Sequence, residues 1–266
     1  MKIRIIGAGR AGRSFELALR EVGVDVDLLP GRSPHPALAS GAHGVDAVLL
    51  AVPDRHIAAV ARCIRPEVDC ALLHCSGSLG LDVLEPHMRR GSVHPLATLP
   101  DAVVGSLRLR GGTFFAVSGD QKATDLALVL GGRPIVVDAT DRARYHAAAC
   151  VASNHLVALL GQVQRMAADA GLPLEAFLPL ARGALDDVTM LGPALALTGP
   201  ASRGDGPTIE AHREAIDPSE LSAYDAGVEL ARRLAAGRGE STAPRAASSR
   251  AAASPAPATA HAVSRS

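Results

Sequence analysis

The sequence lacks tryptophan and has few other aromatic residues, which together make up 2% of its 266 positions. Its core must therefore be built mainly from Ala, Leu and Val. At about 100–200 residues per domain, the length suggests one large domain or two ordinary ones. Lysine is also scarce: apart from Lys2 and Lys122, all 27 basic residues are arginines. Any mechanism that requires a lysine has almost no candidates.

The sequence also lacks an excess of charge, because 27 acidic residues balance the 27 basic ones. This balance argues against duplex nucleic acid and anionic membranes as partners. No apolar run approaches the ~18 residues of a membrane span, and the first residues show no signal-peptide pattern. The four cysteines form no CxxC pair and no zinc-type cluster with histidine. We therefore expect a soluble cytoplasmic protein without a metal site.

Short apolar runs alternate with helical patterns in the first half of the chain, which is typical of a parallel sheet covered by helices. The runs predict strands at 2–6, 24–29, 45–52, 70–73, 92–96, 113–117 and 135–137. Helices are predicted at 13–22, 57–64 and 124–130. Together these elements predict an α/β domain over residues 1–139, with a Rossmann-type doubly wound parallel sheet.

The second half of the chain has a different pattern, with no predicted strand after Asp138. Apolar residues at steps of three or four from Tyr145 to Ala170 predict one long amphipathic helix, with Thr140 or Asp141 as its cap. Further helices are predicted at 174–191, 208–216 and 218–234. We assign residues 140–236 to an all-helical domain. Residues 237–266, rich in Ala, Ser, Pro and Arg, are predicted to form a disordered tail.

The segment GAGRAG follows the first predicted strand and has the G-x-G-x-x-G spacing of a dinucleotide-binding turn. Gly7 permits the tight turn, Gly9 lets the backbone approach a pyrophosphate, and Gly12 lets the helix pack against the strand. The alternative is a structural turn without a ligand. We expect the whole segment to bind a dinucleotide, through Gly7, Ala8, Gly9, Arg10, Ala11 and Gly12.

The end of the second predicted strand bears on the choice between NADP and NAD. An NAD site would place a carboxylate there, but Asp27 is followed by two apolar residues and is expected within the strand. The next loop offers Arg32 and Ser33, which can bind a 2′-phosphate. The loop therefore favours NADP, with NAD as the alternative if Arg32 is an ordinary solvated arginine.

Three further strand ends are expected at the same edge of the sheet, because ligands bind outside the carboxyl ends of parallel strands. AVPD supplies Val52 and Pro53, an apolar wall suited to a ribose or nicotinamide. HCSG supplies His74 and Ser76, and SVHPL supplies His94. We expect Ser76 to contact cofactor or substrate, and His94 or His74 to donate a proton. A structural hydrogen-bonding role is the alternative for either histidine.

With these motifs the chain resembles the DUF2520 family of Rossmann-like bacterial proteins, over roughly residues 1–235. The resemblance rests on GAGRAG, AVPD, HCSG, GSVHPL, YHAAACVASNHLVALL and ALTGPASRGDGPTIEAH. The family is similar in layout to the 6-phosphogluconate dehydrogenase-like oxidoreductases, which include ketopantoate and pyrroline-5-carboxylate reductases. The resemblance implies a dinucleotide domain, a helical second domain and a homodimer formed through the helices.

One position departs from that superfamily, whose hydroxyacid dehydrogenases carry a catalytic Lys four residues before an Asn. Asn154 matches the Asn, but Cys150 stands where the Lys would be. His146, Cys150 and Asn154 are predicted to share one stripe of the long helix. His146 and Asn154 would lie about 12 Å apart along its axis and grip opposite ends of a small substrate. A surface or dimer-contact role is the alternative for His146 and His155.

The predicted function is NADPH-dependent reduction of a small oxo or imino acid, a carboxylate, in a cleft between the two domains. In the loop LTGPASRGD, Arg203 is a candidate for binding the carboxylate, and Asp205 is predicted to cap the helix at Thr208. One alternative is a prephenate-dehydrogenase-like enzyme, since GSVHPL is similar to the His-Pro loop of that group. The other is a non-catalytic dinucleotide-binding regulatory protein that lost the Lys.

Overall fold

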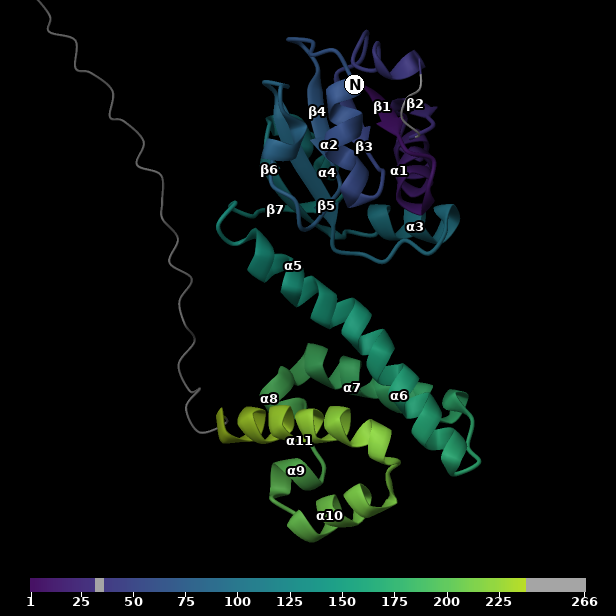
Figure 1. Cartoon of the computed structure of the whole chain (residues 1–266), viewed down its shortest axis with the longest axis vertical. Coiled ribbons are helices and arrows are strands. Elements are labelled where there is room, and N and C mark those ends of the chain that lie inside the picture. The colour runs from purple at the N-terminus through teal and green to yellow at the C-terminus, as the bar shows by residue number, and fades with distance from the viewer. Residues whose placement is uncertain (32–35, 238–266) are drawn as a thin grey trace, which may run out of the picture. The chain divides into compact units, whose positions relative to one another are not determined.

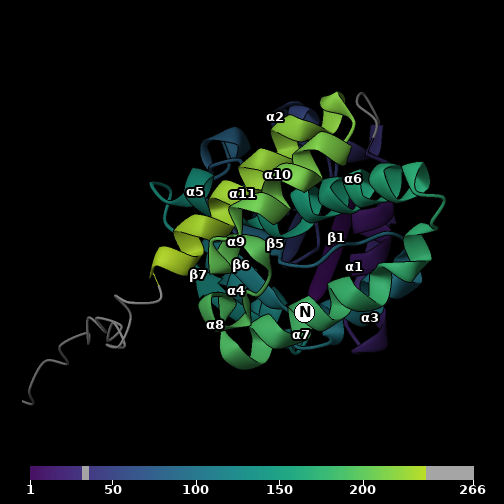
Figure 2. The ribbon, with the colours of Figure 1, turned by 90° about the horizontal axis from the view of Figure 1, so that it is seen from below.

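The structure is a computed structural model that describes residues 1–31 and 36–237 (Figure 1). The chain divides into two compact units, Met1–Leu159 and a second unit that begins at Leu160. Within the described residues, the first unit contains every strand and the second is helical (Figures 1 and 2). Arg32, Ser33 and residues 238–266 of the predicted tail lie outside the described residues.

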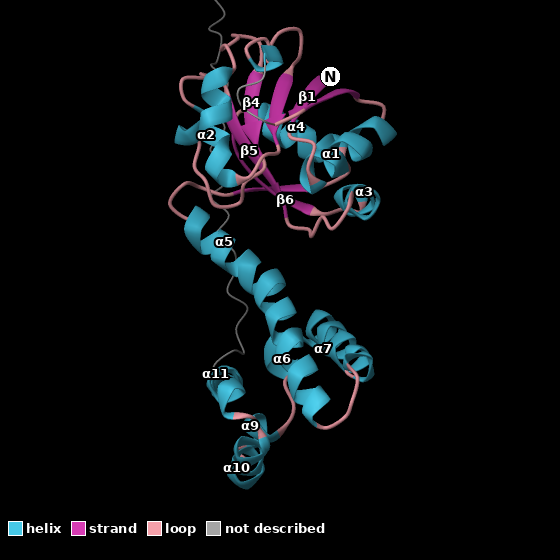
Figure 3. Cartoon of the chain, turned by 45° about the vertical axis from the view of Figure 1, so that its right-hand side comes forward, coloured by secondary structure: helices cyan, strands magenta, loops and turns pink. Residues whose placement is uncertain are grey.

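A seven-stranded sheet in the order β2-β1-β3-β4-β5-β6-β7 forms the centre of the first unit (Figure 3). Its strands are β1 (Lys2–Ile6), β2 (Asp25–Leu29), β3 (Ala47–Leu50), β4 (Ala71–His74), β5 (Arg90–Pro95), β6 (Phe114–Gly119) and β7 (Arg133–Val136). The first five strands are parallel, as predicted for a Rossmann-type fold. The last two run the other way, because β6 pairs antiparallel with β5. The sheet is therefore mostly parallel.

Helices cover both faces of the sheet (Figure 3). One face carries α1 (Arg10–Glu21), α3 (Ala102–Arg110) and α4 (Gln121–Val129). The other carries α2 (Asp54–Cys63) and the 3-10 turns η1 (Pro36–Leu38) and η2 (Asp82–Leu84). Successive side chains of a strand point to opposite faces, so the continuous apolar run of β3 is buried on both faces, as predicted.

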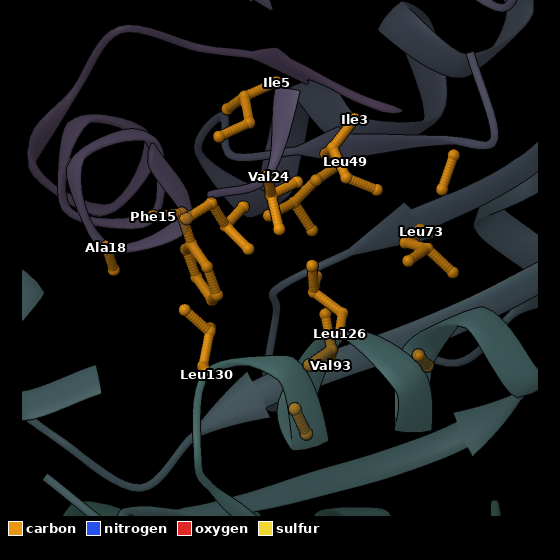
Figure 4. Packing of buried hydrophobic residues seen from close by; sticks show 14 of the residues in the cluster. Ile3, Ile5, Phe15, Ala18, Val24, Leu49, Leu73, Val93, Leu126 and Leu130 are labelled. Carbon is orange, nitrogen blue, oxygen red and sulfur yellow. The ribbon is translucent and has the colours of Figure 1, made fainter. Parts of the chain in front are cut away.

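The core under α1 and α4 fixes the strand ends that carry the candidate site (Figure 4). Phe15 of α1 and Leu126 of α4 pack against strand residues on this face. Those strand residues include Ile3, Ile5, Leu49, Leu73 and Val93. Each fully buried side chain of this kind contributes about 1.5–3 kcal/mol. The turns after the strands thus extend from a tightly packed sheet.

Helix α3 is absent from the sequence prediction. Asp101 caps it by accepting hydrogen bonds from the N–H groups of Val103 and Val104, at 2.9 Å and 2.9 Å. Its apolar residues do not form one stripe, because Val103 and Leu107 are exposed. The helix connects β5 to the antiparallel β6, whose start lies at the same edge of the sheet as the end of β5. It is therefore not a crossover helix, and the regular β-α-β pattern does not predict it.

The long helix predicted across residues 145–170 is present, but it is interrupted. It consists of α5 (Arg142–Cys150), the π-helical turn η3 (Val151–His155) and α6 (Leu156–Asp169). Asp141 stands at its start, but its carboxylate accepts a hydrogen bond from Arg144 at 2.6 Å rather than from a backbone N–H. A π turn is wider than an α turn and changes which side chains share a face.

The second unit has little core of its own. Its elements after α6 are η4 (Leu174–Ala176), α7 (Leu178–Leu191), α8 (Pro193–Ala196), α9 (Pro200–Arg203), α10 (Gly206–Ala215), η5 (Pro218–Glu220) and α11 (Leu221–Ala236). The short helices α8 and α9 were not predicted. Among the described residues of this unit, Ala167 and Ile209 are the buried hydrophobic residues. Large exposed side chains include Leu180, Leu185, Met190, Leu195 and Leu230. No described helix is both long and apolar enough to cross a membrane.

Candidate functional site

The glycine turn lies at the carboxyl end of β1, where the strand order reverses between β1 and β3. Gly7 has φ 121°, a left-handed value that favours glycine, and a Cβ there would lie 2.4 Å from the Ala51 carbonyl oxygen. A Cβ on Gly12 would lie 1.8 Å from the Gly7 carbonyl oxygen. The protein's own packing therefore requires both of these glycines.

Gly9 differs from its two neighbours in the motif. Its φ of −78° and ψ of −171° are open to any residue, and a Cβ there would have no protein atom within 4 Å. No side chain caps α1, and its first turn carries no acidic residue, so its N–H groups are available to an anion. Neither backbone strain nor packing accounts for glycine here, whereas a group bound against the backbone would.

A first cavity of about 640 Å³ opens beside this turn. Among the predicted cofactor residues, Gly7, Ala8, Gly9, Val52 and Pro53 line it. The remaining walls come from Pro30, Gly31, Ala51, His56, Ala59 and Val60. The volume and the apolar walls suit part of a dinucleotide.

A second cavity of about 510 Å³ brings together three of the four predicted catalytic residues. His94 comes from β5, while His146 and Asn154 come from α5 and η3, all within the first unit. Cys150, Ser153 and Thr98 also line it. The fourth predicted residue, His74, does not.

A third cavity of about 450 Å³ shares residues with the second. It is lined by Thr98, Ser153 and Asn154 together with Arg10, the first residue of α1. The fingerprint helix and the histidine-lined cavity are therefore adjacent. Ala11 and Gly12 belong to α1 and line none of the three cavities.

His94 has one engaged ring nitrogen and one free of hydrogen bonds. Its Nδ1 lies 2.5 Å from the Tyr145 hydroxyl oxygen, and within the described residues Nε2 has no hydrogen-bond partner. A Cβ on Gly77 would lie 2.9 Å from Nε2 of His94 and 2.6 Å from Cδ2 of His146, so glycine is required where the chain passes against both rings. Burial, then the neighbouring His146 and Arg142, lower the pKa of His94 to about 4. The ring is neutral at neutral pH.

His74 has neither nitrogen available to a ligand. Its Nε2 donates to the Gly80 carbonyl at 3.2 Å, and its Nδ1 accepts the Ser76 backbone N–H at 3.2 Å. The side chain is fully buried, and burial lowers its pKa to about 4. His74 therefore shapes the loop after β4 as a neutral ring, which favours His94 over His74 as the proton donor.

Ser76 also has a structural partner. Its hydroxyl donates to the Asp54 carboxylate at 2.7 Å, and that of Ser78 donates to the same oxygen at 2.8 Å. This joins the loop after β4 to the start of α2. Burial raises the pKa of the adjacent Cys75 thiol to about 12, so that thiol is not a nucleophile. Among the described residues, no group of three or more His, Cys, Asp or Glu side chains is arranged to hold a metal ion.

Arg142 and Tyr145 are site residues that the sequence analysis missed. Arg142 is 4% exposed, and its Nη2 donates to the hydroxyls of Ser92 at 2.6 Å and Ser118 at 2.8 Å. It forms no ion pair within the described residues, and burial lowers its pKa. Arg142 is one of 25 arginines, and Tyr145 fits the apolar stripe of the helix, so neither carried a sequence signal.

Residues of the LTGPASRGD segment belong to the second unit. Asp205 caps α10, as predicted, by accepting the Thr208 backbone N–H at 3.2 Å. Arg203 ends α9 and is exposed. His155 ends η3 and is also exposed.

The sheet, the glycine turn and the helices that follow define a Rossmann-type α/β protein with a helical C-terminal part. The family described as Domain of unknown function (DUF2520) matches residues 113–231. This match confirms the resemblance predicted from the motifs. It covers YHAAACVASNHLVALL and LTGPASRGDGPTIEAH, while the glycine turn precedes it.

Several solved structures share this fold. Protein TM1727 from Thermotoga maritima is 25% identical, with 88% of this chain and 98% of that chain covered and a TM-score of 0.67. A reductive aminase from Aspergillus terreus in complex with NADPH and ethyl levulinate is 14% identical, and the alignment covers 88% of this chain and 97% of that chain with a TM-score of 0.65. The Plasmodium falciparum pyrroline carboxylate reductase with NADP bound is 15% identical, and the alignment covers 88% of this chain and 98% of that chain with a TM-score of 0.58. No curated protein matches the chain.

Proposed function

We propose that this protein is an NADP-dependent oxidoreductase that reduces a small oxo or imino acid. The observation that carries the proposal is Gly9, a glycine at an open helix N-terminus that neither its backbone conformation nor its packing requires. Structures with the same fold hold NADPH or NADP. They include an aminase and an imino acid reductase, which supports a C=O or C=N substrate.

The residues present fit a dinucleotide at the first cavity. The N–H groups at the start of α1, beside Gly9, suit a pyrophosphate. Val52 and Pro53 offer an apolar wall for a ribose or nicotinamide. The preference for NADP over NAD rests on Arg32 and Ser33 and remains a prediction from the sequence.

NADPH, when bound, supplies the hydride that reduces the substrate carbon. This chain supplies the proton for the substrate oxygen or nitrogen from Nε2 of His94, whose other nitrogen is held by Tyr145. Asn154 offers an amide in the same cavity to orient the substrate, whereas the Ser153 hydroxyl donates to the Ala149 carbonyl at 2.7 Å. No Lys or Arg lines that cavity, so neutral donors would bind the substrate carboxylate there.

We infer that the protein acts as a homodimer through its helical unit. A unit that buries so few apolar side chains cannot offset the entropy of ordering its chain. The exposed leucines and Met190 therefore require a cover, and a second copy supplies a matching apolar face.

The alternative is a dinucleotide-binding regulatory protein without catalysis. The presence of Cys150 at the position of the superfamily's lysine favours this alternative. It predicts cofactor binding without turnover. The two functions therefore share a first experimental step and differ in the second.

The test begins with a fluorescence titration of the purified protein with NADPH and, for comparison, NADH. Turnover is then followed as NADPH absorbance with a panel of 2-oxo acids, cyclic imino acids and prephenate. Turnover that is lost in His94→Gln and kept in His155→Gln, a variant of an exposed histidine at the end of η3, supports the reductase. Saturable binding without turnover supports the regulatory protein. If neither NADPH nor NADH binds saturably, both the reductase and the regulatory protein are overturned.

A further inference from the structure

Three side chains of one helix face meet behind His94. Tyr145 and His146 follow Arg142 on α5 by three and four residues, so both lie on the same side of the helix as Arg142. Tyr145 holds Nδ1 of His94 at 2.5 Å, with the two rings edge to face at 5.7 Å between centroids. The His146 ring also contacts His94 edge to face, with 6.1 Å between the two ring centroids.

Arg142 is joined to this cluster through Gly77. Its Nη1 points at the carbonyl oxygens of Ser76 and Gly77, at 3.4 and 3.5 Å, and Gly77 packs against Nε2 of His94. A buried guanidinium normally has a carboxylate partner, because an uncompensated buried charge is costly. Within the described residues Arg142 has hydroxyls and carbonyls instead. Its positive charge is therefore not neutralised by a side chain.

The same charge acts on Tyr145. Burial raises the pKa of the Tyr145 phenol to about 12, and Arg142 opposes that rise. At neutral pH the phenol is therefore protonated and can donate to Nδ1. A phenolate at this position would find Arg142 as its counter-ion.

We propose that Tyr145 and Arg142 are positioning residues that make His94 a neutral proton donor. The Tyr145 hydroxyl donates to Nδ1 and thereby keeps the ring proton on Nε2, and Arg142 stabilises the phenolate that remains when the Tyr145 proton moves to Nδ1. The inference rests on the proposed reductase function and names its source of the proton.

The proton balance closes with solvent water as the only further reactant. After hydride addition the substrate carries an alkoxide or amide, a stronger base than a phenolate. The Nε2–H bond of His94 breaks as an O–H or N–H bond forms on the substrate. The Tyr145 proton moves to Nδ1, so the ring remains neutral and the phenolate charge faces Arg142. Water then protonates Nε2 as the Nδ1 proton returns to the Tyr145 oxygen, and the hydroxide that forms leaves to the solvent, so the starting tautomer is restored.

Other titratable groups also act on His94, and the test must separate their effects. Besides burial, His146, Arg142 and His74 lower the pKa of His94, whereas Asp54 raises it. Within the part of the chain that the structure describes, Tyr145 is the hydrogen-bond partner of Nδ1. The tautomer and the pKa of His94 are therefore the two quantities to measure. Tyr145 is expected to set the tautomer, and Arg142 is expected to lower the pKa.

The experiment is a pH titration of the full-length protein labelled with 15N-histidine, followed by long-range 1H–15N NMR correlations that distinguish the two neutral tautomers. His94→Gln identifies the His94 signals. In the wild type we expect the Nε2–H tautomer and a pKa near 4. Tyr145→Phe, which removes only the hydroxyl, should lose this tautomer preference. Arg142→Gln should raise the His94 pKa by about one pH unit.

Two further variants keep the result interpretable. Arg142→Lys keeps the charge and should leave the His94 pKa low. Arg144→Gln removes an arginine of the same helix that is 85% exposed, and should change nothing. The proposal is overturned if the wild type carries its proton on Nδ1, or if folded Arg142→Gln leaves the pKa of His94 unchanged. If Arg142→Gln does not fold, the proposal is tested by Tyr145→Phe, and it is overturned if His94 keeps the Nε2–H tautomer in that variant.

These measurements need neither cofactor nor substrate. A failure to bind NADPH would end the proposed function and leave the histidine titration unaffected. Conversely, NADPH binding combined with an Nδ1–H tautomer would end this inference alone. The two failures are thus distinguishable.

Discussion

Replacing Gly9 with aspartate should abolish dinucleotide binding while leaving the fold intact. Gly9 is the N-cap of α1, with a backbone conformation that any residue adopts and open space around its Cβ direction. Aspartate is a preferred N-cap residue and interacts favourably with the helix dipole, so its substitution for glycine should stabilise the free protein by a few tenths of a kcal/mol. A measurable loss of folding stability is not expected.

The effect on the ligand is expected to be large, because a carboxylate at the helix start would face a pyrophosphate. Two unit charges about 4 Å apart near a protein surface interact with about 4 kcal/mol. This corresponds to an affinity about 1,000-fold weaker. Gly9→Asn is the matched control, since it has nearly the same shape and capping ability without the charge. Its loss of affinity measures the steric effect of a side chain at this position, and the additional loss in Gly9→Asp measures the effect of the charge.

The assay combines an NADPH fluorescence titration with thermal unfolding of the free and NADPH-saturated proteins. In the wild type NADPH should raise the melting temperature, and in Gly9→Asp it should not. Gly12→Ala provides the contrast, because its Cβ would overlap the Gly7 carbonyl oxygen and should destabilise the free protein. If Gly9→Asp binds NADPH as tightly as the wild type, the phosphates do not lie at α1 and the reasoning is refuted.

Two further predictions concern stability and assembly. The pKa values of His74 and His94 fall from 6.5 to about 4 on folding, so the unfolded chain binds more protons between these values; stability should decrease as pH falls from about 6.5 to about 4. Urea unfolding at several pH values in this range gives the free energy of unfolding as a function of pH. This free energy should change less with pH in His94→Gln than in the wild type, and an identical pH dependence would contradict the low pKa of His94. Leu180→Glu and Met190→Glu, at side chains 72% and 71% exposed, should convert a dimer to a less stable monomer in analytical ultracentrifugation. Val68→Glu, at a side chain of the first unit that is 87% exposed, should not; a wild-type monomer would rule out the homodimer.

The strands of the fold were predictable because each is a short, buried apolar run. β1 occupies Lys2–Ile6, the predicted range, and the other strands overlap their predicted ranges. The direction of β6 was not predictable, since the same side chains suit either orientation. Helix α3 was missed because packing on α1 stabilises it without an apolar stripe along its length. Tertiary contacts decided both features.

The candidate site was predictable where it depends on spacing and not where it depends on contacts. The glycine motif follows one predicted strand and His94 lies near the end of another, so topology brings both to the same edge of the sheet. Arg142 and Tyr145 became identifiable only through Ser92, Ser118 and His94, which are distant in the sequence. His74 matched the pattern of a proton donor, but its hydrogen bonds to the backbone favour the structural alternative.

The π-helical turn η3 lets the long helix hold one extra residue. In an α-helix each residue advances the side-chain direction by about 100°. A π turn takes in one residue more than an α turn. Compared with an uninterrupted α-helix of the same length, it therefore changes the direction of the side chains after Leu156 by about 100°. Removing one residue from η3 would restore a regular α-helix and leave the later side chains close to their present directions, whereas a deletion within α5 or α6 would rotate them by about 100°. A single deletion should therefore be tolerated better inside η3 than elsewhere in the long helix.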